Sequence, residues 1–522
     1  MRSAEKIRRD RAAGPAPALI DPVGRRSWNR REFIGVAAAS AVATALGCSR
    51  EPSSSLREAV RLAESRRPHS GRVVEAVLTA DRTSIDLGGP LAVTTAYNEM
   101  VPGPLVRAKV GDEVEVVVHN RLPKATSVHW HGIALRNDMD GASPASPDIP
   151  QRQTFVYRFS VPHPGTYWAH PHTGLDADTG LYLPVIVDDP NDPGDYDAEW
   201  IIMLDDWTDG TGSSPSQIYD GLRKAPMAAH HMPGMPSHRS DEREVPGVGG
   251  VEPSVVLGGD AGDVTYPYYL ANGRVPMAPD VLAVKPGHRV RIRLINAGSD
   301  TAFRVALSSH RLTITHTDGY PVVPRDFDAV LIGMGERYDM LVTVGDGGFA
   351  LVAEALGKRA LARALLISGV GEPPPVGFMP SELNGQLATT QQLHATHEVA
   401  LPEVESDTHV PLTLNGSMMR YDWSINGTPF SDAHAIPIAA GRRVNMTFTN
   451  TTSMWHPMHL HGHTFQVVRR GALPGPRKDT LIVLPGQMTT VTFEADNPGE
   501  WMLHCHNTYH QEAGMMTSLM YS

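Results

Sequence analysis

A repeated pattern of glycine, alternating apolar residues and asparagine divides this 522-residue chain into three similar stretches. The pattern occurs at residues 110–120, 286–296 and 440–450, and each time the Gly and the Asn lie nine residues apart. Alternation with a period of two predicts a strand with one buried face. The three glycines are 176 and 154 residues apart, which is the length of a domain. The chain is therefore predicted to repeat one strand-rich domain three times.

A second pattern recurs later in each repeat. Residues 164–172 match residues 498–506 in frame, since both stretches begin with Pro-Gly and end with His-x-His. The middle repeat has a similar stretch, but Ala353 and Ala355 take the two histidine positions, so this domain is expected to lack metal ligands there. We expect an all-β fold of three Greek-key β-sandwich domains. Their expected ranges are 68–190, 197–372 and 390–522.

Histidines gather in four short clusters, two in the first expected domain and two in the last. On a strand, residues i and i+2 point to the same face, so both rings of a His-x-His pair can approach one metal centre. Cys505 lies between His504 and His506 and must point to the opposite face, so one short strand is expected to serve two metal sites. Ten of the 24 histidines belong to the clusters: His129, His131, His170, His172, His456, His459, His461, His504, His506 and His510.

The cysteine side of that strand predicts a blue-copper electron-transfer site. Cys505 supplies a thiolate, His456 and His510 supply imidazoles, and Met515 supplies a weak axial thioether. Zinc also accepts Cys and His ligands, but a Cys-x-His bridge into a cluster of eight histidines would have no purpose for zinc. The remaining eight histidines suit three further copper ions, because imidazole-rich sites with open positions can bind and reduce dioxygen.

These motifs resemble those of the multicopper oxidase family, which includes laccases, cuprous oxidases and metal-tolerance oxidases. The resemblance implies cupredoxin-like domains, four copper ions per chain, and one-electron oxidation of a donor coupled to the reduction of dioxygen to water. It also implies that electrons pass from type 1 copper through Cys505 to its two histidine neighbours. The implied type 1 ligands are His456, Cys505, His510 and Met515; the type 2 ligands are His129 and His459; the type 3 sets are His131, His170 and His506, and His172, His461 and His504.

The resemblance further implies a proton relay, since the reduction of dioxygen to water consumes protons. In family members with this spacing, an acid just before a glycine relays protons near the copper cluster, which assigns that role to Asp140. A turn aspartate that caps its own loop is the alternative. Some relatives carry a glutamate directly after the last type 1 histidine. Here Gln511 stands there, followed by Glu512, so the second proton route stays open.

The copper motifs fix the oxidant and leave the electron donor open. Met and His residues crowd one polar loop, and soft thioethers select Cu(I), which favours the oxidation of cuprous ion in copper tolerance. A compositionally biased loop without a role is the plain alternative. Thr452 stands where copper-oxidising relatives carry an acidic ligand. The candidate substrate ligands are Met227, His230, His231, Met232, Met235 and His238, together with Met454 just before the first type 1 histidine.

Three other functions are compatible with this fold. The main competitor is laccase-like oxidation of phenols and aromatic amines. A copper-free scaffold is disfavoured by the intact ligand set, and oxygen consumption with a donor would separate an oxidase from a copper-storage protein. The net charge of −11 argues against nucleic acid as a partner and mildly favours cationic substrates, although solubility also explains it.

Residues 1–47 are expected to be an export signal. Arg30 and Arg31 precede a short apolar run, which is typical of a Tat signal and is too short to span a bilayer. The small residues before Cys48 resemble a lipoprotein cleavage site, although Ala45 replaces the usual Leu. We expect a periplasmic or cell-surface protein that the Tat machinery exports. A lipid on Cys48 would anchor it to the membrane, and simple cleavage and release is the alternative.

The export hypothesis can be tested by fractionation. Replacing Arg30 and Arg31 together by Lys should leave the precursor in the cytoplasm, because the signal depends on the arginine pair. Cys48→Ala should release a mature protein that is otherwise attached to the membrane. If the Cys48→Ala variant and the parent protein were found in the membrane fraction to the same extent, lipidation of Cys48 would be contradicted.

Overall fold

In a computed structural model, which describes residues 54–192, 194–224, 245–406, 408–469, 471 and 473–522, each repeated stretch forms a strand that ends at its asparagine. The expected signal at 1–47, Cys48 and the substrate-ligand candidates between Met227 and His238 lie outside the described residues. The repeated strands are β4 (Glu113–Asn120), β12 (Arg289–Asn296) and β24 (Arg443–Asn450). The repeated glycine has φ of +83° at Gly111, +82° at Gly287 and +71° at Gly441, a backbone region that favours glycine.

The repeated asparagine closes the loop that follows each strand. Asn296 donates from Nδ2 to the carbonyls of Thr301 (2.9 Å) and Ile332 (3.2 Å), and its Oδ1 accepts the N–H of Gly298 (2.9 Å). Asn120 and Asn450 make the equivalent bonds in the other two repeats. All three side chains are buried, so they satisfy loop backbone groups that water cannot reach.

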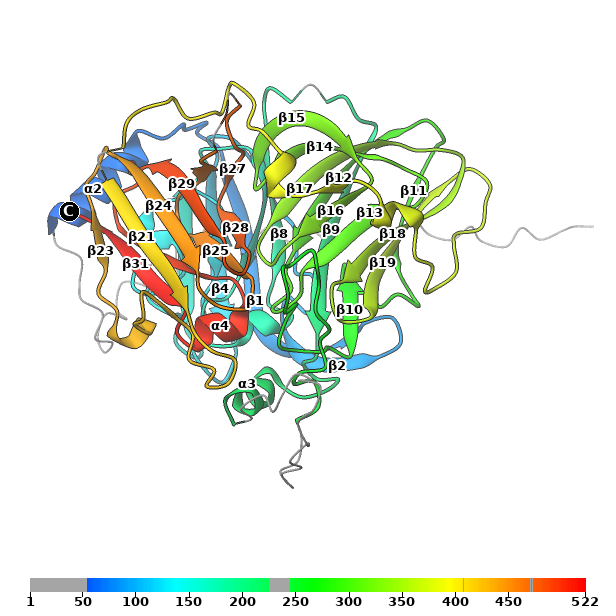
Figure 1. The fold of residues 1–522 in the computed structure, drawn as a ribbon. Helices are drawn as coiled ribbons and strands as arrows, with labels where there is room; N and C mark the ends of the chain where they lie inside the picture. The colour runs from blue at the N-terminus through cyan, green and yellow to red at the C-terminus, as the bar shows by residue number, and fades with distance from the viewer. Residues whose placement is uncertain (1–53, 193, 225–244, 407, 470, 472) are drawn as a thin grey trace, which may run out of the picture. The chain divides into compact units, whose positions relative to one another are not determined.

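Two sheets form in each third of the chain, which confirms the all-β, cupredoxin-like fold (Figure 1). The first third forms the sheets β2-β1-β4-β6 and β3-β8-β7-β5. Their other strands are β1 (Val73–Asp86), β2 (Leu91–Tyr97), β3 (Val106–Lys109), β5 (His129–His131), β6 (Thr154–Ser160), β7 (Gly165–His170) and β8 (Leu183–Asp188).

The middle third forms the sheets β10-β9-β12-β17-β14-β15 and β11-β19-β18-β13-β16-β20. The strands besides β12 are β9 (Ala198–Trp207), β10 (Tyr268–Ala271), β11 (Asp280–Val284), β13 (Phe303–Leu307), β14 (Leu312–Thr317), β15 (Tyr320–Phe327), β16 (Ala329–Ile332), β17 (Arg337–Thr343), β18 (Gly347–Ala355), β19 (Ala360–Ser368) and β20 (Leu387–Ala388).

The last third forms the sheets β22-β21-β24-β29-β26-β27 and β23-β31-β30-β25-β28. The strands besides β24 are β21 (Thr408–Asn415), β22 (Ser424–Ile425), β23 (Ile436–Ile438), β25 (His456–Leu460), β26 (Phe465–Val467), β27 (Arg477–Lys478), β28 (Thr480–Val483), β29 (Met488–Glu494), β30 (Glu500–Cys505) and β31 (Met516–Tyr521). The described α-helices are α2 (Ser54–Ser65), α3 (Pro215–Lys224) and α4 (Thr508–Glu512).

The three thirds share one topology. In each, the repeated strand pairs in parallel with the first long strand of its unit: β4 with β1, β12 with β9 and β24 with β21. The described residues belong to one compact unit, so the division into three domains at the expected boundaries stays a prediction. None of the described helices has the length and apolar character that crossing a bilayer requires.

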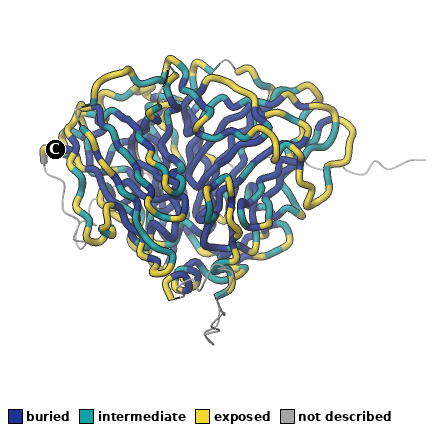
Figure 2. The backbone as a smooth tube through the Cα atoms, in the orientation of Figure 1, coloured by how far each residue is buried: buried dark blue, intermediate teal, exposed yellow. Residues whose placement is uncertain are grey.

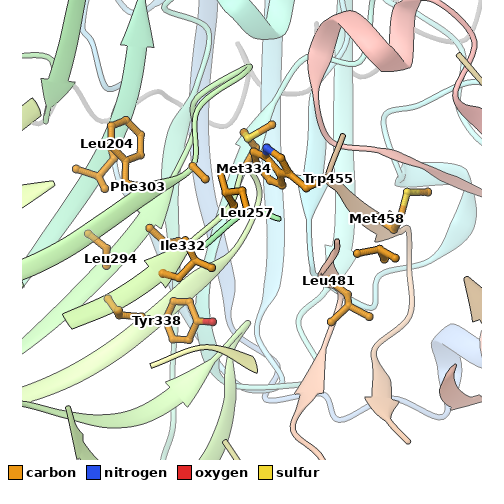
Figure 3. Close-up of a cluster of buried hydrophobic side chains, with 14 of the residues drawn as sticks. Leu204, Leu257, Leu294, Phe303, Ile332, Met334, Tyr338, Trp455, Met458 and Leu481 are labelled. Carbon is orange, nitrogen blue, oxygen red and sulfur yellow. The ribbon is translucent and has the colours of Figure 1, made fainter. Parts of the chain in front are cut away.

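The apolar core is continuous between the middle and the last thirds. Buried side chains of both, including Phe303, Trp455 and Leu481, belong to one cluster (Figure 3). The Trp455 ring donates from Nε1 to the carbonyl of Ala261 at 3.2 Å. Buried segments run along the strands, and the exposed segments are mostly loops (Figure 2). This shared core ties the histidine motifs of the last third to a unit that carries none of them.

The repeated asparagine gives a test of the fold that is independent of metal. Asn296→Ala should lower the free energy of unfolding by about 3 kcal/mol, because it leaves buried backbone groups without partners. The measurement is urea unfolding of the full chain, with Asn384→Ala as the control because Asn384 is exposed. Equal unfolding midpoints for the two variants would contradict the structural role.

Candidate metal centre

The histidine motifs lie on, or just after, the strands of two matching pairs, β5 with β7 and β25 with β30. His129 pairs with His170 in the first, and His459 pairs with His504 in the second. Each pair of strands therefore presents a row of imidazoles on one face. The first and last thirds of the chain bring these two rows together in one buried cluster.

Eight histidines form this cluster, four from each end of the chain. The rings of His129 and His461 stack with centroids 3.7 Å apart, and those of His131 and His459 stack at the same distance. In three triplets the ligand nitrogens lie within 4.8 Å of one another. The triplets are His129, His131 and His170; His129, His459 and His461; and His172, His461 and His504. His506 completes the cluster, with Nε2 3.2 Å from Nδ1 of His131.

Backbone carbonyls fix the orientation of several rings. Nδ1 of His129 donates to the carbonyl of Asp140 at 2.9 Å, and Nδ1 of His459 donates to that of Asp479 at 2.9 Å. His170 and His504 are held in the same way by the carbonyl of the following residue. Since a neutral imidazole carries one N–H, these bonds leave the Nε2 lone pairs to face the middle of the cluster.

The cluster fits copper. Nε2 of His129, His170 and His459 is buried and has no hydrogen-bond partner among the residues that the structure describes, an arrangement that is costly unless a ligand is bound. Burial lowers the pKa of His170 and His504 well below the usual histidine value, so the rings are neutral and keep the lone pair that a metal needs. Neutral imidazoles in this number suit copper ions with open positions for dioxygen.

Two carboxylates accept hydrogen bonds from ring nitrogens on the outer side of the cluster. Oδ2 of Asp140 accepts from Nδ1 of His461 at 2.8 Å, and Oδ1 lies 3.3 Å from Nδ1 of His129. Oδ1 of Asp479 accepts from Nε2 of His131 at 3.1 Å. Burial alone would raise the pKa of Asp479, but the Arg337 guanidinium outweighs burial and holds that pKa well below its usual range. Such outer carboxylates orient metal ligands and raise their basicity.

A second site lies on the other side of β30. Sγ of Cys505 is 3.7 Å from Nδ1 of His456 and 3.7 Å from Nδ1 of His510, and the two nitrogens are 3.1 Å apart. Met515 is buried beside them, since its carbonyl accepts the N–H of Cys505 and its N–H donates to the carbonyl of His510. Alternation along the strand thus sends Cys505 to one site and its histidine neighbours to the other, as the sequence pattern predicted.

The outer edges of this second site carry different partners. Nε2 of His510 donates to Oδ2 of Asp263 at 3.0 Å, and Tyr421 donates to the same oxygen at 2.7 Å. Burial disfavours the charged ring, but Asp263 and Cys505 outweigh burial and raise the pKa of His510 to about 10. Nε2 of His456 instead lies 2.9 Å from the Thr452 hydroxyl. The ring edge of His510 therefore meets a carboxylate, whereas the ring edge of His456 meets a neutral hydroxyl.

Three predicted residues, Met454, Gln511 and Glu512, lie outside the two sets of metal ligands. Met454 is fully buried, and its backbone pairs with Asp260 in an isolated bridge. Gln511 is buried and Glu512 is exposed, although partial desolvation first and Asp176 second raise the pKa of Glu512. The assignment of individual histidines to individual copper ions stays a prediction.

Sequence reasoning missed Asp263, Asp479 and Arg337. None of them lies in a histidine motif, and Asp263 and Arg337 come from the middle third, which has no histidine motif at all. Asp263 is 247 residues from its partner His510, and Asp479 is 348 residues from His131. No local spacing could have identified these contacts, because the fold alone creates them.

Comparison with known proteins covers almost the whole chain. Three family models described as Multicopper oxidase match residues 79–192, 198–367 and 403–522. The chain is 53% identical over 504 residues to "Multicopper oxidase MmcO" of Mycobacterium tuberculosis, which covers 95% of this chain and 97% of that protein. It is 28% identical to "Copper resistance protein A homolog" of Pseudomonas syringae pv. tomato, which covers 93% of this chain and 98% of that protein.

A solved structure agrees with the architecture. The crystal structure of laccase from Botrytis aclada superimposes with a TM-score of 0.72 at 25% sequence identity. The superposition covers 88% of this chain and 89% of the laccase chain. The similarity extends over all three thirds, including the middle third without histidine motifs.

The two sites predict a specific response to loss of the thiolate. The copper-loaded chain should be blue and hold about four copper ions, and Cys505→Ser should abolish the blue colour and the oxidase activity with little change in fold. Absorption, copper analysis and far-UV circular dichroism measure these properties. Cys48→Ala, which removes the other cysteine of the chain, is the control and should stay blue. A colourless parent protein with a full copper content would contradict this assignment.

Proposed function

The chain belongs to the multicopper oxidase family, and we propose that its electron donor is the cuprous ion and its role is copper tolerance. It is a copper-dependent oxidoreductase that uses dioxygen as electron acceptor. The main support is the crowding of thioethers and imidazoles between Met227 and His238, because these groups bind Cu(I) well. Similarity over 93% of the chain to a protein named for copper resistance is consistent with this role.

The described residues on either side of that segment pack near the second site. Helix α3, which directly precedes the segment, carries Tyr219, whose ring centroid is 6.3 Å from that of Tyr421. Tyr421 in turn donates to Asp263, the partner of His510. After the segment, the carbonyl of Pro246 accepts from Ser213 at 2.7 Å, just before α3. The described chain that flanks the Met/His segment therefore lies on the same side of the molecule as the proposed site of electron uptake.

The copper ligands are proposed in four sets. When bound, copper supplies one-electron transfer and the reduction of dioxygen. The type 1 ion would be held by His456, Cys505, His510 and Met515, and the type 2 ion by His129 and His459. One type 3 ion would be held by His131, His170 and His506, and the other by His172, His461 and His504.

We propose that Asp140 handles protons beside the eight-histidine cluster. Its Oδ2 is occupied by the hydrogen bond from His461, whereas its buried Oδ1 has no hydrogen-bond partner among the described residues. Oδ1 is therefore the atom that would receive a proton and release it toward the cluster. Gln511 has no carboxyl group, so the proposal includes no second route through that position.

Laccase-like oxidation of phenols and aromatic amines is the second candidate function. The Botrytis aclada laccase shares the fold, and Thr452 offers no negative charge to a metal-ion donor. Asp263 favours a cation, because its carboxylate adjoins His510. Copper analysis of the purified chain would separate either oxidase from a copper-free scaffold, and oxygen uptake would separate it from a storage protein.

We also propose export by the Tat machinery to the periplasm or the cell surface, with a lipid anchor on Cys48. The proposal rests on the arginine pair and on the small residues before Cys48. Cleavage after residue 47 would remove nine basic and four acidic residues and leave a net charge of −16. A more negative mature protein would attract a cationic donor more strongly.

The donor can be identified by comparing oxygen uptake with Cu(I), Fe(II) and a phenol. Replacing Met227, Met232 and Met235 together by Ser should raise the apparent KM for Cu(I) about fivefold. This corresponds to a loss of about 1 kcal/mol in the free energy of Cu(I) binding. Phenol oxidation should be unchanged or faster. Met454→Leu, which keeps the buried volume and removes the thioether, should instead lower kcat for Cu(I).

The control replaces the exposed Met277, Met379 and Met488 by Ser, and copper content is checked in every variant. Equal losses on both donors would indicate general damage to the protein. Unchanged Cu(I) kinetics in the loop variant would remove the support from the Met/His segment and favour the laccase-like function.

A further inference from the structure

The side chain of Arg337 connects all three thirds of the chain. It is the first residue of β17, in the middle third, and is fully buried. Its two terminal nitrogens each donate to one carboxylate oxygen of Asp479, both at 2.6 Å. Its Nε donates to the carbonyl of Thr166 in β7 at 3.1 Å, and Nη1 also donates to the carbonyl of Gly335 at 3.0 Å. This two-point geometry is specific to a guanidinium group.

Arg337 also lies against the first histidine motif. Gly132, which follows His131, has a φ of +84°, and a Cβ atom at this position would collide with the guanidinium. The glycine of the His-Trp-His-Gly motif is thus needed for the close approach of Arg337. The glycine therefore links the motif to a residue of a different third of the chain.

Asp479, the partner of Arg337, controls two rings of the cluster. Its Oδ1 accepts from Nε2 of His131, and its backbone carbonyl accepts from Nδ1 of His459. The His131 ring is turned the other way round from the rings that bind backbone carbonyls. Its Nε2 points outward to Asp479, and its Nδ1 faces the cluster, 3.2 Å from Nε2 of His506. An anionic acceptor at Nε2 keeps the ring proton there and leaves the Nδ1 lone pair to face the cluster.

The carboxylate of Asp479 needs a compensating charge to stay in place. Asp318 is also buried and accepts the N–H groups of Asp479 and Thr480, both at 3.2 Å, so a second negative charge lies close by. Lys478 balances Asp318 and Glu336, with Nζ–O distances of 3.1 and 3.0 Å. Arg337 is thus the cation that meets Asp479 directly. Removal of one partner from a buried pair leaves an uncompensated charge, which favours rearrangement.

We propose that Arg337 is a positioning residue for the three-copper centre: it fixes the carboxylate of Asp479 and thereby the ring orientation and tautomer of His131. This inference rests on the proposed copper assignment of His131, and it gives the middle third a direct part in building a centre for which it supplies no ligand. Outer partners of this kind typically change metal affinity about 10- to 100-fold when they are removed.

Arg293 provides a matched control. It is also a buried arginine of the middle third, and it donates to Asp339 at 2.9 Å, to Glu199 at 2.6 Å and to the Thr166 hydroxyl at 2.9 Å. It therefore joins the same first and middle thirds through a comparable buried network. The hydrogen bonds of Arg293 reach none of the eight histidines, so its loss should affect stability without affecting the centre.

The test compares Arg337→Gln, Arg337→Lys and Arg293→Gln in the full copper-loaded chain. Copper content, the blue absorption of type 1 copper, the near-ultraviolet absorption of the type 3 pair and the paramagnetic resonance spectrum of type 2 copper are measured. Arg337→Gln should stay blue. In competition with a chelator, however, the affinity of its three-copper centre for copper should fall about 10-fold or more. Arg337→Lys should show a smaller loss, because an ammonium group cannot bind both carboxylate oxygens at once.

Arg293→Gln should lose stability but keep all copper signals. Unchanged type 2 and type 3 signals in Arg337→Lys would overturn the proposal even if Arg337→Gln does not fold. Equal loss of these signals in Arg293→Gln would also overturn it, because the effect would then be general. A parent protein that holds no copper would instead contradict the proposed function itself.

Discussion

The pleat of β30 connects the two metal sites of this molecule. Successive side chains on a strand point to opposite faces, so Cys505 reaches His456 and His510 while His504 and His506 reach the eight-histidine cluster. The covalent backbone therefore holds the two sites at a fixed separation. Strand β25 follows the same rule in register with β30, since Met458 pairs with Cys505 and His459 with His504. Any loss of this register would disrupt both sites together.

The buried cluster also depends on control of each ring proton. Backbone carbonyls hold Nδ1 of four rings, whereas the Asp479 carboxylate reverses the arrangement at His131. Carbonyls come with the strands and turns of the two outer thirds, so the local fold supplies them without further residues. The carboxylate carries a charge, and burial of that charge requires a cation. The middle third provides this cation as Arg337, which explains how a unit without ligands contributes to the centre.

The sequence allowed much of this to be predicted, because the main signals are local. The Gly-to-Asn spacing predicted β4, β12 and β24, and the i, i+2 rule predicted that Cys505 and its neighbours face different sites. The contacts of Asp263 with His510 and of Arg337 with Asp479 could not be predicted, because they join residues far apart in the sequence. Helix α2 was not predicted either, since the first domain was expected to begin at residue 68.

The two edges of the second site differ in a way that bears on the donor. His456 meets the neutral hydroxyl of Thr452, whereas His510 meets Asp263, which also binds Tyr421. Among the described residues, both ring edges are thus covered by protein groups, so a donor would reach the rings through these partners. A cation is attracted to the carboxylate at His510 and gains nothing from the hydroxyl at His456. The buried carboxylate of Asp263 on the His510 side of this site therefore suits a cuprous ion better than a neutral phenol.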